Sequence, residues 1–293
     1  MAPSGLVRAG LQQILDLEQL DRYLFRGRAR PGAETRVFGG EVAGQALIAA
    51  ARTVTAERTV HSLHAYFLRP GDPGRPIVYQ VDPARDGRSF TTRRVVGSQH
   101  GEPIFVLSAS FQGHEDGLSH QLAVLDAADP DGLPDPAGAL ADTDGRTRQW
   151  LDQLARTFPV ELRFPDGPPR AVEQAGAVRA PRQVVWMRSA DPLPADPALH
   201  ACAATYFSDL MLLPTALLPH GLMLGDPRLQ IASLDHAVWF HAPFRADEWL
   251  CYEQEGSWAG GGRALCRGSL FDRSGTLVAT VMQEGLIRVR SGR

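Results

Sequence analysis

The amino-acid sequence predicts an α+β protein in which one structural unit is used twice. Each half of the chain contains one strongly apolar helical segment, at residues 41–54 in the first half and 199–213 in the second. Each of these segments is followed by four segments of strand-like composition, separated by turns that contain Pro or Gly. A repeated unit of one buried helix and one meandering antiparallel sheet is an α+β arrangement.

Three segments favour helices, and they differ in how they expose apolar residues. Residues 11–24 (LQQILDLEQLDRYL) place Leu and Ile at helical spacing, which predicts an amphipathic helix. Residues 41–54 (EVAGQALIAAARTV) are apolar over nearly the whole helical circumference, so we expect this helix to be buried. Residues 199–213 (LHACAATYFSDLMLL) have the same character and end near Pro214.

The strand-like segments follow the same order in both halves. In the first half they are residues 60–69, 76–82, 88–96 and 103–112, and in the second half 229–241, 249–255, 263–271 and 276–283. A further helix is expected at 146–158, with strands at 160–164 and 183–188. The two halves also share a short motif, because SLHA at 62–65 is similar to SLDHA at 233–237.

A change of composition separates the halves. Residues 126–145 are rich in Asp, Pro, Gly and Ala, which predicts an exposed linker without a core of its own. We therefore expect an N-terminal domain at residues 1–112, a linker at 113–145 and a C-terminal domain at 146–293.

Composition narrows the class of protein. The formal net charge of the 293 residues is -3, and the 30 basic residues, all Arg, are scattered, so nothing favours a nucleic-acid partner. Three widely spaced cysteines predict neither a disulfide framework nor a metal site. The sequence shows neither the apolar core of a signal peptide nor an apolar run of about 20 residues. We expect a cytoplasmic protein without a membrane span.

Asp209 is the most informative single residue. It lies inside the apolar segment 199–213, where an unpaired carboxylate would be costly to bury. Desolvation raises the pKa of a carboxyl group, which prepares it to act as a general base. The alternative is an exposed Asp near the end of a helix.

Other polar motifs carry less information. Residues 38–45 (FGGEVAGQ) lack the Lys-Ser/Thr of a P-loop, so they predict a helix entry that packs closely. A triad of Ser233, Asp235 and His236 is disfavoured because no G-x-S-x-G motif occurs. In a regular strand, moreover, His236 would point away from the other two side chains. Gln283 ends the last apolar strand and is either an edge residue or a functional one.

Many short segments together match one family. They are residues 37–40 (VFGG), 44–47 (GQAL), 61–72 (HSLHAYFLRPGD), 85–90 (RDGRSF), 93–95 (RRV), 103–105 (PIF), 109–112 (ASFQ), 233–236 (SLDH), 239–241 (WFH), 243–244 (PF), 248–249 (EW) and 283–285 (QEG). With these segments the chain resembles the type II acyl-CoA thioesterases, the family of bacterial thioesterase II and its peroxisomal relatives. The resemblance extends over about residues 11–290.

This resemblance implies a double hotdog fold, with two tandem antiparallel sheets each wrapped around a long central helix. It also implies hydrolysis of fatty acyl-CoA to free fatty acid and coenzyme A by a water molecule that Asp, Thr and Gln side chains hold. In this chain these positions are Asp209, Ser233 and Gln283. Ser233 departs from the family's Thr but keeps the hydroxyl group, so we expect a reduced rate before a lost function.

Further expectations concern the substrate. Backbone N–H groups near Gly39 and Gly40 are candidates for stabilising the oxyanion. Arg88, Arg93 or Arg94 is a candidate contact to the phosphates of coenzyme A, and we select Arg88. His61 belongs to the family's hallmark strand and is included as a substrate-binding candidate, although its spacing alone favours a structural role. No metal or redox cofactor is needed, and hotdog sheets commonly associate, so a homo-oligomer is expected by analogy.

Two alternatives to hydrolysis stay open at this point. A hotdog enoyl-CoA hydratase or dehydratase would use an Asp and a His five residues apart in a D-x-N-P-x-H pattern. Here Pro214 lies five residues after Asp209, and the pattern does not occur elsewhere. The other alternative is a protein that binds acyl-CoA without turnover.

Overall fold

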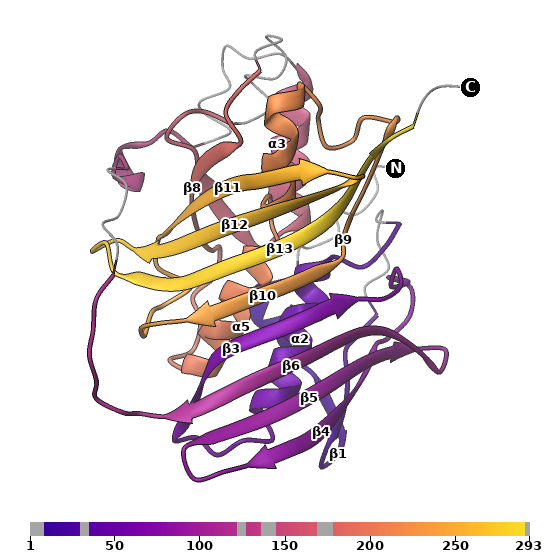
Figure 1. Cartoon of the computed structure of the whole chain (residues 1–293), viewed down its shortest axis with the longest axis vertical. Helices are drawn as coiled ribbons and strands as arrows, with labels where there is room; N and C mark the ends of the chain where they lie inside the picture. Colours follow the sequence, from indigo (N-terminus) through magenta and orange to yellow (C-terminus); the bar gives the residue numbers. More distant parts are fainter. Residues whose placement is uncertain (1–8, 30–34, 122–126, 136–144, 169–177, 291–293) are drawn as a thin grey trace, which may run out of the picture.

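One curved antiparallel sheet of thirteen strands covers two long helices, α2 and α5 (Figure 1). The structure is a computed structural model, and it describes residues 9–29, 35–121, 127–135, 145–168 and 178–290. The strand order is β1-β2-β4-β5-β6-β3-β10-β13-β12-β11-β8-β7, and β9 pairs with β13. The α+β prediction is confirmed.

The elements of the two halves are as follows. The first half contains α1 (Leu11–Leu15), β1 (Glu18–Asp21), β2 (Leu24–Arg26), α2 (Gly39–Ala51), β3 (Arg58–Phe67), β4 (Val78–Asp86), β5 (Phe90–Gln99) and β6 (Glu102–Gly113). The second half contains η1 (Pro130–Gly132), α3 (Gly145–Thr157), β7 (Val160–Arg163), β8 (Arg182–Ser189), α5 (Pro197–Ser208), η2 (Leu213–His220), β9 (Leu229–Ser233), β10 (Asp235–Phe240), β11 (Leu250–Gly260), β12 (Arg263–Asp272) and β13 (Leu277–Val289).

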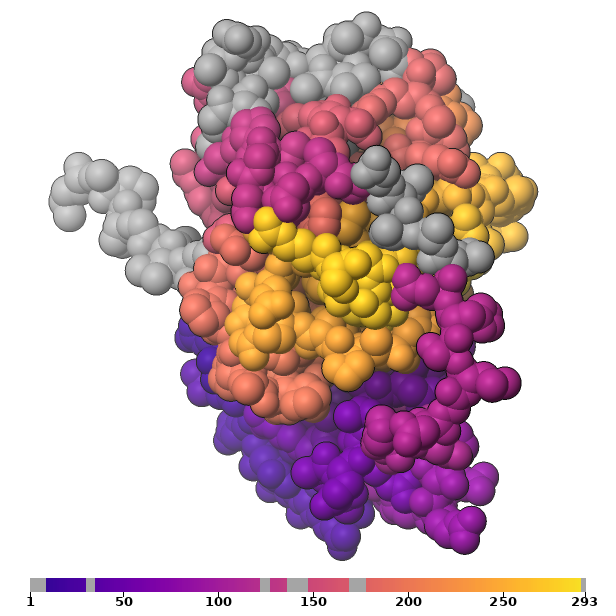
Figure 2. Space-filling model, turned by 90° about the vertical axis from the view of Figure 1, so that its left-hand side faces the viewer, coloured from indigo at the N-terminus to yellow at the C-terminus, as the bar shows by residue number. Residues whose placement is uncertain are grey.

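The two tandem sheets that were expected join edge to edge into one continuous sheet. Strand β3 pairs with β10 in antiparallel register, from Tyr66 opposite Asp235 to Ser62 opposite Trp239. Residues 114–121 form an exposed strap that leads from β6 along the outside to the second half (Figures 1 and 2). There the Gln121 side chain donates a hydrogen bond to Gly275 O and accepts one from Leu277 N.

The two apolar helices are buried as predicted, and glycines allow them to pack closely. Every residue of α2 from Gly40 to Ala50 is buried, and so is every residue of α5 from Leu199 to Ser208. A Cβ atom on Gly40 would lie 2.4 Å from Tyr206 O, and one on Gly44 would lie 3.1 Å from Cys202 O. Later residues of α2 contact earlier residues of α5, so the two helices are antiparallel. The N-terminus of α2 therefore meets the C-terminus of α5.

The predicted helix at residues 11–24 is wrong beyond Leu15. The chain extends at Asp16, and residues 18–26 form the edge strands β1 and β2. The reason is long-range pairing, because Phe25 lies opposite Tyr79 of β4 and is completely buried there. Tertiary contacts thus override the local helical periodicity.

The predicted linker is not fully exposed. Pro130 is buried, Trp186 Nε1 donates to Ala128 O at 2.9 Å, and Arg273 forms ion pairs with Asp129 and Asp131. The physical reason is a second apolar cluster on the sheet face opposite the helices, which these residues cover; it consists of Trp186, Trp249, Cys251 and Phe271. Residues 122–126 and 136–144 of the predicted linker lie outside the described residues.

In the described part of the chain, one helical stretch, Pro197–His220, is long and apolar enough to cross a membrane. It comprises α5 and η2, and 94% of its apolar window is buried inside the protein, as in a core helix.

Substitution of Gly40 by Ala should destabilise the fold. The new methyl group would meet the Tyr206 carbonyl oxygen, which is part of the backbone and cannot rotate away. Overpacking of this kind costs about 1–3 kcal/mol, whereas Ala gains up to about 1 kcal/mol over Gly in a helix, so we expect a net loss of up to about 2 kcal/mol. Urea denaturation would measure it. Gly117→Ala is the control, because nothing lies within 4 Å of its added Cβ. Equal midpoints for the two variants would contradict the prediction.

Candidate active site

Asp209, Ser233 and Gln283 meet at the C-terminal end of α5. Ser233 Oγ donates to Asp209 Oδ1 at 3.3 Å, and Gln283 Nε2 contacts the same oxygen at 2.5 Å. Gln283 Nε2 also lies 3.2 Å from Ser233 Oγ. Asp209 and Ser233 are half-buried and Gln283 is fully buried. These polar groups come from three elements far apart in the sequence, and they form one closed trio.

A β-bulge directs Ser233 toward Asp209. Ser233 lies opposite Gly285 of β13, but Ala237 lies opposite Met282, so the register changes by one residue between them. An extra residue reverses the alternation of side chains. Both Ser233 and His236 therefore face α5, and His236 Nε2 lies 2.7 Å from Ser208 Oγ. The expectation that they point to opposite faces is wrong for this reason.

The bulge residue, Leu234, is itself fixed by its neighbours. Its N–H donates to Glu284 O at 2.9 Å, and its carbonyl accepts from Phe67 N at 2.9 Å. The carboxylate of Asp235 also accepts from Glu284 N at 2.6 Å. The backbone next to Ser233 is therefore bonded to strands on both sides.

Side chains from the sheet hold the backbone on either side of Asp209. The helix ends at Ser208 with Asp209 as its C-cap, and Met211, further along the chain, adopts a left-handed conformation with φ of +66°. The carbonyl groups released at a helix end need other donors. These are Tyr252 Oη for Ser208 O at 2.8 Å, Gln254 Nε2 for Leu210 O at 3.2 Å and Gln183 Nε2 for Met211 O at 3.1 Å.

The N-terminus of α2 lies against the second carboxylate oxygen of Asp209. A Cβ on Gly39 would lie 2.7 Å from Asp209 Oδ2 and 2.9 Å from the Phe67 ring, so only Gly leaves room. The first N–H groups of a helix have no partner inside the helix, and they carry partial positive charge. Among the described residues, no acceptor pairs with the N–H of Gly39 or Gly40. The two predicted glycines thus begin the helix that abuts the trio.

The interior behind Asp209 is lined by two buried groups that stay uncharged near neutral pH. Burial lowers the pKa of His236, and the charges of Asp209 and Asp235 oppose this shift. Burial raises the pKa of Tyr252 well above its usual value, and the nearby charge of Asp209 adds to the effect. Neither His236 nor Tyr252 therefore adds a charge beside Asp209 near neutral pH.

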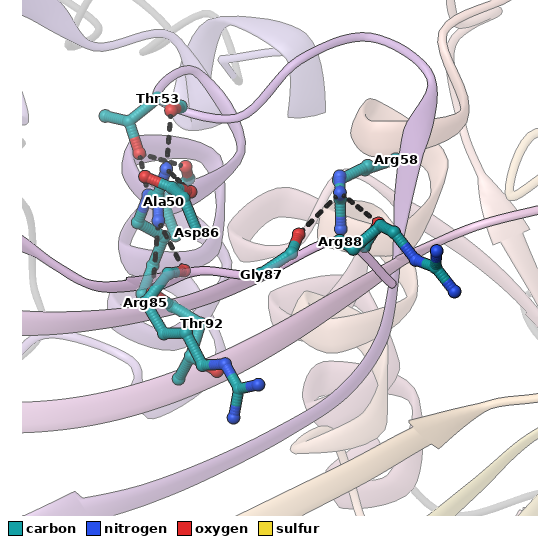
Figure 3. Close-up of polar contacts among 9 residues, drawn as sticks. Ala50, Thr53, Arg58, Arg85, Asp86, Gly87, Arg88 and Thr92 are labelled. Carbon is teal, nitrogen blue, oxygen red and sulfur yellow. Dashed lines mark hydrogen bonds and ion pairs between the residues drawn. The ribbon is translucent and has the colours of Figure 1, made fainter. Parts of the chain in front are cut away.

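The structure places His61 and Arg88 away from the trio. His61 is half-buried in β3, with Nε2 2.8 Å from Ser110 Oγ. Arg88 is exposed between β4 and β5, where its carbonyl oxygen accepts from Arg58 Nη2 at 2.8 Å (Figure 3). Arg58 begins β3, whereas Phe67 ends that strand beside Gly39. Substrate contacts by His61 and Arg88 stay predictions.

Arg93, the alternative to Arg88, is buried and already fully engaged. It donates to Thr53 Oγ1 at 2.9 Å and to Thr53 O at 3.1 Å, and it forms an ion pair with Asp86 at 2.8 Å. Thr53 and Asp86 lie together in Figure 3. This arrangement ties the end of α2 to β4 and β5, so Arg93 has a structural role.

The first half has the same bulge without the polar groups. There the register changes between Val60 opposite Phe111 and Ser62 opposite Ser110. The structural counterparts of Ser233, Gln283 and His236, matched by register and burial, are Val60, Ala109 and Leu63. Among the described residues, the polar trio is therefore built in the second half alone. The motif match of Ser62 to Ser233 does not hold in space.

The residues that hold the α5 end were not singled out from the sequence. Tyr252 and Gln254 alternate on the buried face of a strand, and both are completely buried. Two polar side chains on one buried strand face are a signal that could have been used, because buried polar groups need partners. Their partners could not be predicted, because they are main-chain carbonyls at a helix end.

No group of three or more His, Cys, Asp or Glu side chains that could hold a metal ion occurs in the described ranges.

Known proteins are similar to this chain in sequence and in fold. The family model described as acyl-CoA thioesterase matches residues 154–286, and the acyl-CoA thioesterase N-terminal domain matches residues 28–112. The chain is 41% identical to acyl-coenzyme A thioesterase 8 of Homo sapiens, over 98% of this chain and 92% of that protein.

Solved structures are also similar. The acyl-CoA thioesterase II TesB2 from Mycobacterium marinum has a TM-score of 0.78 and 47% sequence identity, covering 97% of this chain and 100% of that one. A protein with a hot dog fold from Alicyclobacillus acidocaldarius has a TM-score of 0.74 at 21% identity, covering 96% and 98%, and shows the fold alone.

Fold and sequence together define a hotdog-fold thioester hydrolase. More specifically, the chain belongs to the type II acyl-CoA thioesterase family and is an acyl-CoA thioesterase. The resemblance described from the sequence motifs is confirmed.

Substitution of Gly39 by Ala should impair catalysis more than folding. The methyl group would displace Asp209 Oδ2 or the Phe67 ring, and both are side chains that can shift. Misplacement of a reacting group by about 1 Å costs about 100-fold in rate, so a role of Asp209 in the reaction predicts a fall in kcat to this extent. Gly113→Ala is the control, since the nearest atom to its added Cβ is 4.0 Å away. An unchanged kcat for Gly39→Ala would show that the position of Oδ2 does not matter.

The stability of the fold should fall as the pH decreases through the histidine range. Burial lowers the pKa of four histidines, His61, His200, His236 and His241. Below about pH 6.5 the unfolded chain therefore binds more protons than the folded chain, so stability is present above that pH and is lost below it. Urea midpoints at about pH 5.5, 6.5, 7.5 and 8.0 would test this. The last two should agree, and a midpoint that stays level down to the lowest pH would contradict the prediction.

Proposed function

We propose that this thioesterase hydrolyses fatty acyl-CoA by direct attack of a water molecule held by Asp209, Ser233 and Gln283. The observation that carries the proposal is the shared contact of Ser233 Oγ and Gln283 Nε2 with one carboxylate oxygen of Asp209. A half-buried carboxylate next to two polar side chains can accept a proton from water and fix the direction of attack.

The reaction takes place in two stages. Asp209 accepts a proton from the water as its oxygen bonds to the thioester carbonyl carbon. The tetrahedral intermediate then collapses, the C–S bond breaks, and coenzyme A leaves as a thiolate while the fatty acid is released. General base assistance contributes about 10²–10⁴-fold to such a reaction.

Gln283 can bind the water as well as the carboxylate. Its Nε2 faces Asp209 and Ser233, whereas its Oε1 is buried and has no donor among the described residues. An amide oxygen without a donor can accept a hydrogen bond from water. Gln283 is therefore suited to orient the nucleophile.

The N-terminus of α2 supplies the groups that would stabilise the oxyanion. Gly39 lies against Asp209 Oδ2, and the N–H groups of Gly39 and Gly40 have no acceptor among the described residues. Preorganised N–H groups stabilise developing negative charge, and loss of one such donor costs about 10²–10³-fold in kcat. We assign the oxyanion site to this helix end.

Release of thiol from a panel of short- to long-chain acyl-CoAs tests the function and the base together. We expect turnover by the wild type and a loss of at least about 100-fold in kcat for Asp209→Asn, because the amide cannot accept the proton. Asp152→Asn makes the same chemical change at an exposed position of α3 and should match the wild type. Persistent turnover by Asp209→Asn would exclude this residue as the base, and the panel would define the chain length.

Ser233 offers a second test, because the family has Thr there. Ser233→Ala removes the hydroxyl group and should lower kcat by about 10- to 100-fold, as expected for a lost hydrogen bond to a charged group. Ser233→Thr restores the β-branched side chain with a narrower choice of rotamers, so kcat should equal or exceed that of the wild type. Equal rates for Ser233→Ala and the wild type would remove Ser233 from the mechanism.

A further inference from the structure

We propose that His236 is a positioning residue for Asp209, acting through Ser208. The proposal rests on the function proposed above, because it assigns a role relative to the same base. His236 lies in β10 and is completely buried, and its Nε2 is 2.7 Å from Ser208 Oγ. Ser208 is the residue directly before Asp209 and the last residue of α5.

The hydrogen bonds around Ser208 define the direction of the His236 contact. Ser208 Oγ donates its only proton to Thr205 O at 2.9 Å. The hydroxyl oxygen therefore accepts from His236, and Nε2 of the neutral ring carries the proton. Nδ1 is then a buried acceptor, and no donor pairs with it among the described residues.

Both polar groups of Ser208 are held by the sheet. His236 of β10 holds the hydroxyl group, and Tyr252 of β11 holds the carbonyl group at 2.8 Å. Two anchors on one residue fix the backbone from which the Asp209 side chain extends. His236 and Ser233 lie on either side of the same bulge. Ser233 contacts the carboxylate of Asp209, and His236 contacts Ser208, the residue before it.

Comparison of the two halves separates this role from ordinary packing. The counterpart of His236 in the first half is Leu63, which is completely buried at the same point of the bulge. The fold therefore accepts a leucine there. A buried imidazole with an unpaired nitrogen is destabilising relative to an apolar side chain. The buried imidazole occurs only at the position in the half that contains Asp209, Ser233 and Gln283, which links it to that trio.

His236 acts indirectly, because among the described residues no hydrogen bond joins it to the carboxylate of Asp209. Its loss should leave substrate binding intact and disturb the direction of the base. The expected signature is a lower kcat at an unchanged KM.

Two substitutions of similar size distinguish positioning from packing. In His236→Gln the amide nitrogen can occupy the place of Nε2 and donate to Ser208 Oγ, whereas the shorter amide of His236→Asn corresponds to the Nδ1 side and cannot reach it. We expect kcat within about threefold of the wild type for Gln and at least about tenfold lower for Asn, with KM unchanged in both. Equal kcat values for the two variants, or a loss confined to KM, would overturn the proposal.

A third variant keeps the test decisive if the polar substitutions unfold the protein. His236→Leu places the first-half residue at the same site. We expect its urea midpoint to equal or exceed that of the wild type while kcat falls at least about tenfold. A midpoint below that of the wild type combined with full kcat per folded molecule would show that His236 serves packing alone.

Ser208→Ala tests the same hydrogen bond from the other side. Ser208→Ala removes the hydroxyl group that accepts from His236, so kcat should fall as much as in His236→Leu. The double variant Ser208→Ala/His236→Leu should lose no more than either single variant. Additive losses would overturn the proposal. Asp209→Asn is assayed in parallel. If the wild type and Asp209→Asn turned over equally, the proposed base would fail, which is distinct from failure of His236.

Discussion

The close antiparallel packing of α2 and α5 is the constraint on which the rest of the structure depends. Gly40 allows the backbone of one helix to approach the carbonyl of Tyr206 in the other. This contact brings the positive N-terminal end of α2 to the C-terminal end of α5, where Asp209 lies. Every other part of the site is arranged around this meeting of helix ends, and the sheet encloses it from one side (Figure 1).

The sheet contributes through one irregular point and several buried polar side chains. The bulge at Leu234 turns Ser233 and His236 to the same face, which a regular strand could not do. Tyr252 and Gln254 complete the hydrogen bonds of the helix end. A carboxylate whose neighbours are fixed in this way needs little reorganisation during a reaction, which is the property that catalytic groups require.

Local sequence patterns were sufficient for some features and insufficient for others. The two buried helices and most strands were predicted because their residues are apolar throughout or bounded by turns. The positions of Asp209, Ser233 and Gln283 came from the family resemblance. Their side chains are in contact in the structure, and their catalytic roles stay a prediction.

The features that were not predicted depend on partners distant in the sequence. The helix expected at residues 11–24 gives way to strands because Phe25 pairs with Tyr79. The orientation of His236 depends on a register shift against β13, which cannot be seen in one strand. The docking of the linker depends on an apolar cluster around Trp186 that needs cover.

The fusion of the two units into one sheet through β3 and β10 has a consequence for how such a protein can change over time. In a symmetric dimer of identical single units, every substitution appears twice, so a residue must suit both chemistry and scaffolding at once. Here the duplicated units mutate independently. At the positions that match Ser233, His236 and Gln283, the first unit has the apolar residues Val60, Leu63 and Ala109. Apolar packing at these positions in one unit and polar groups at the same positions in the other can therefore coexist in one molecule.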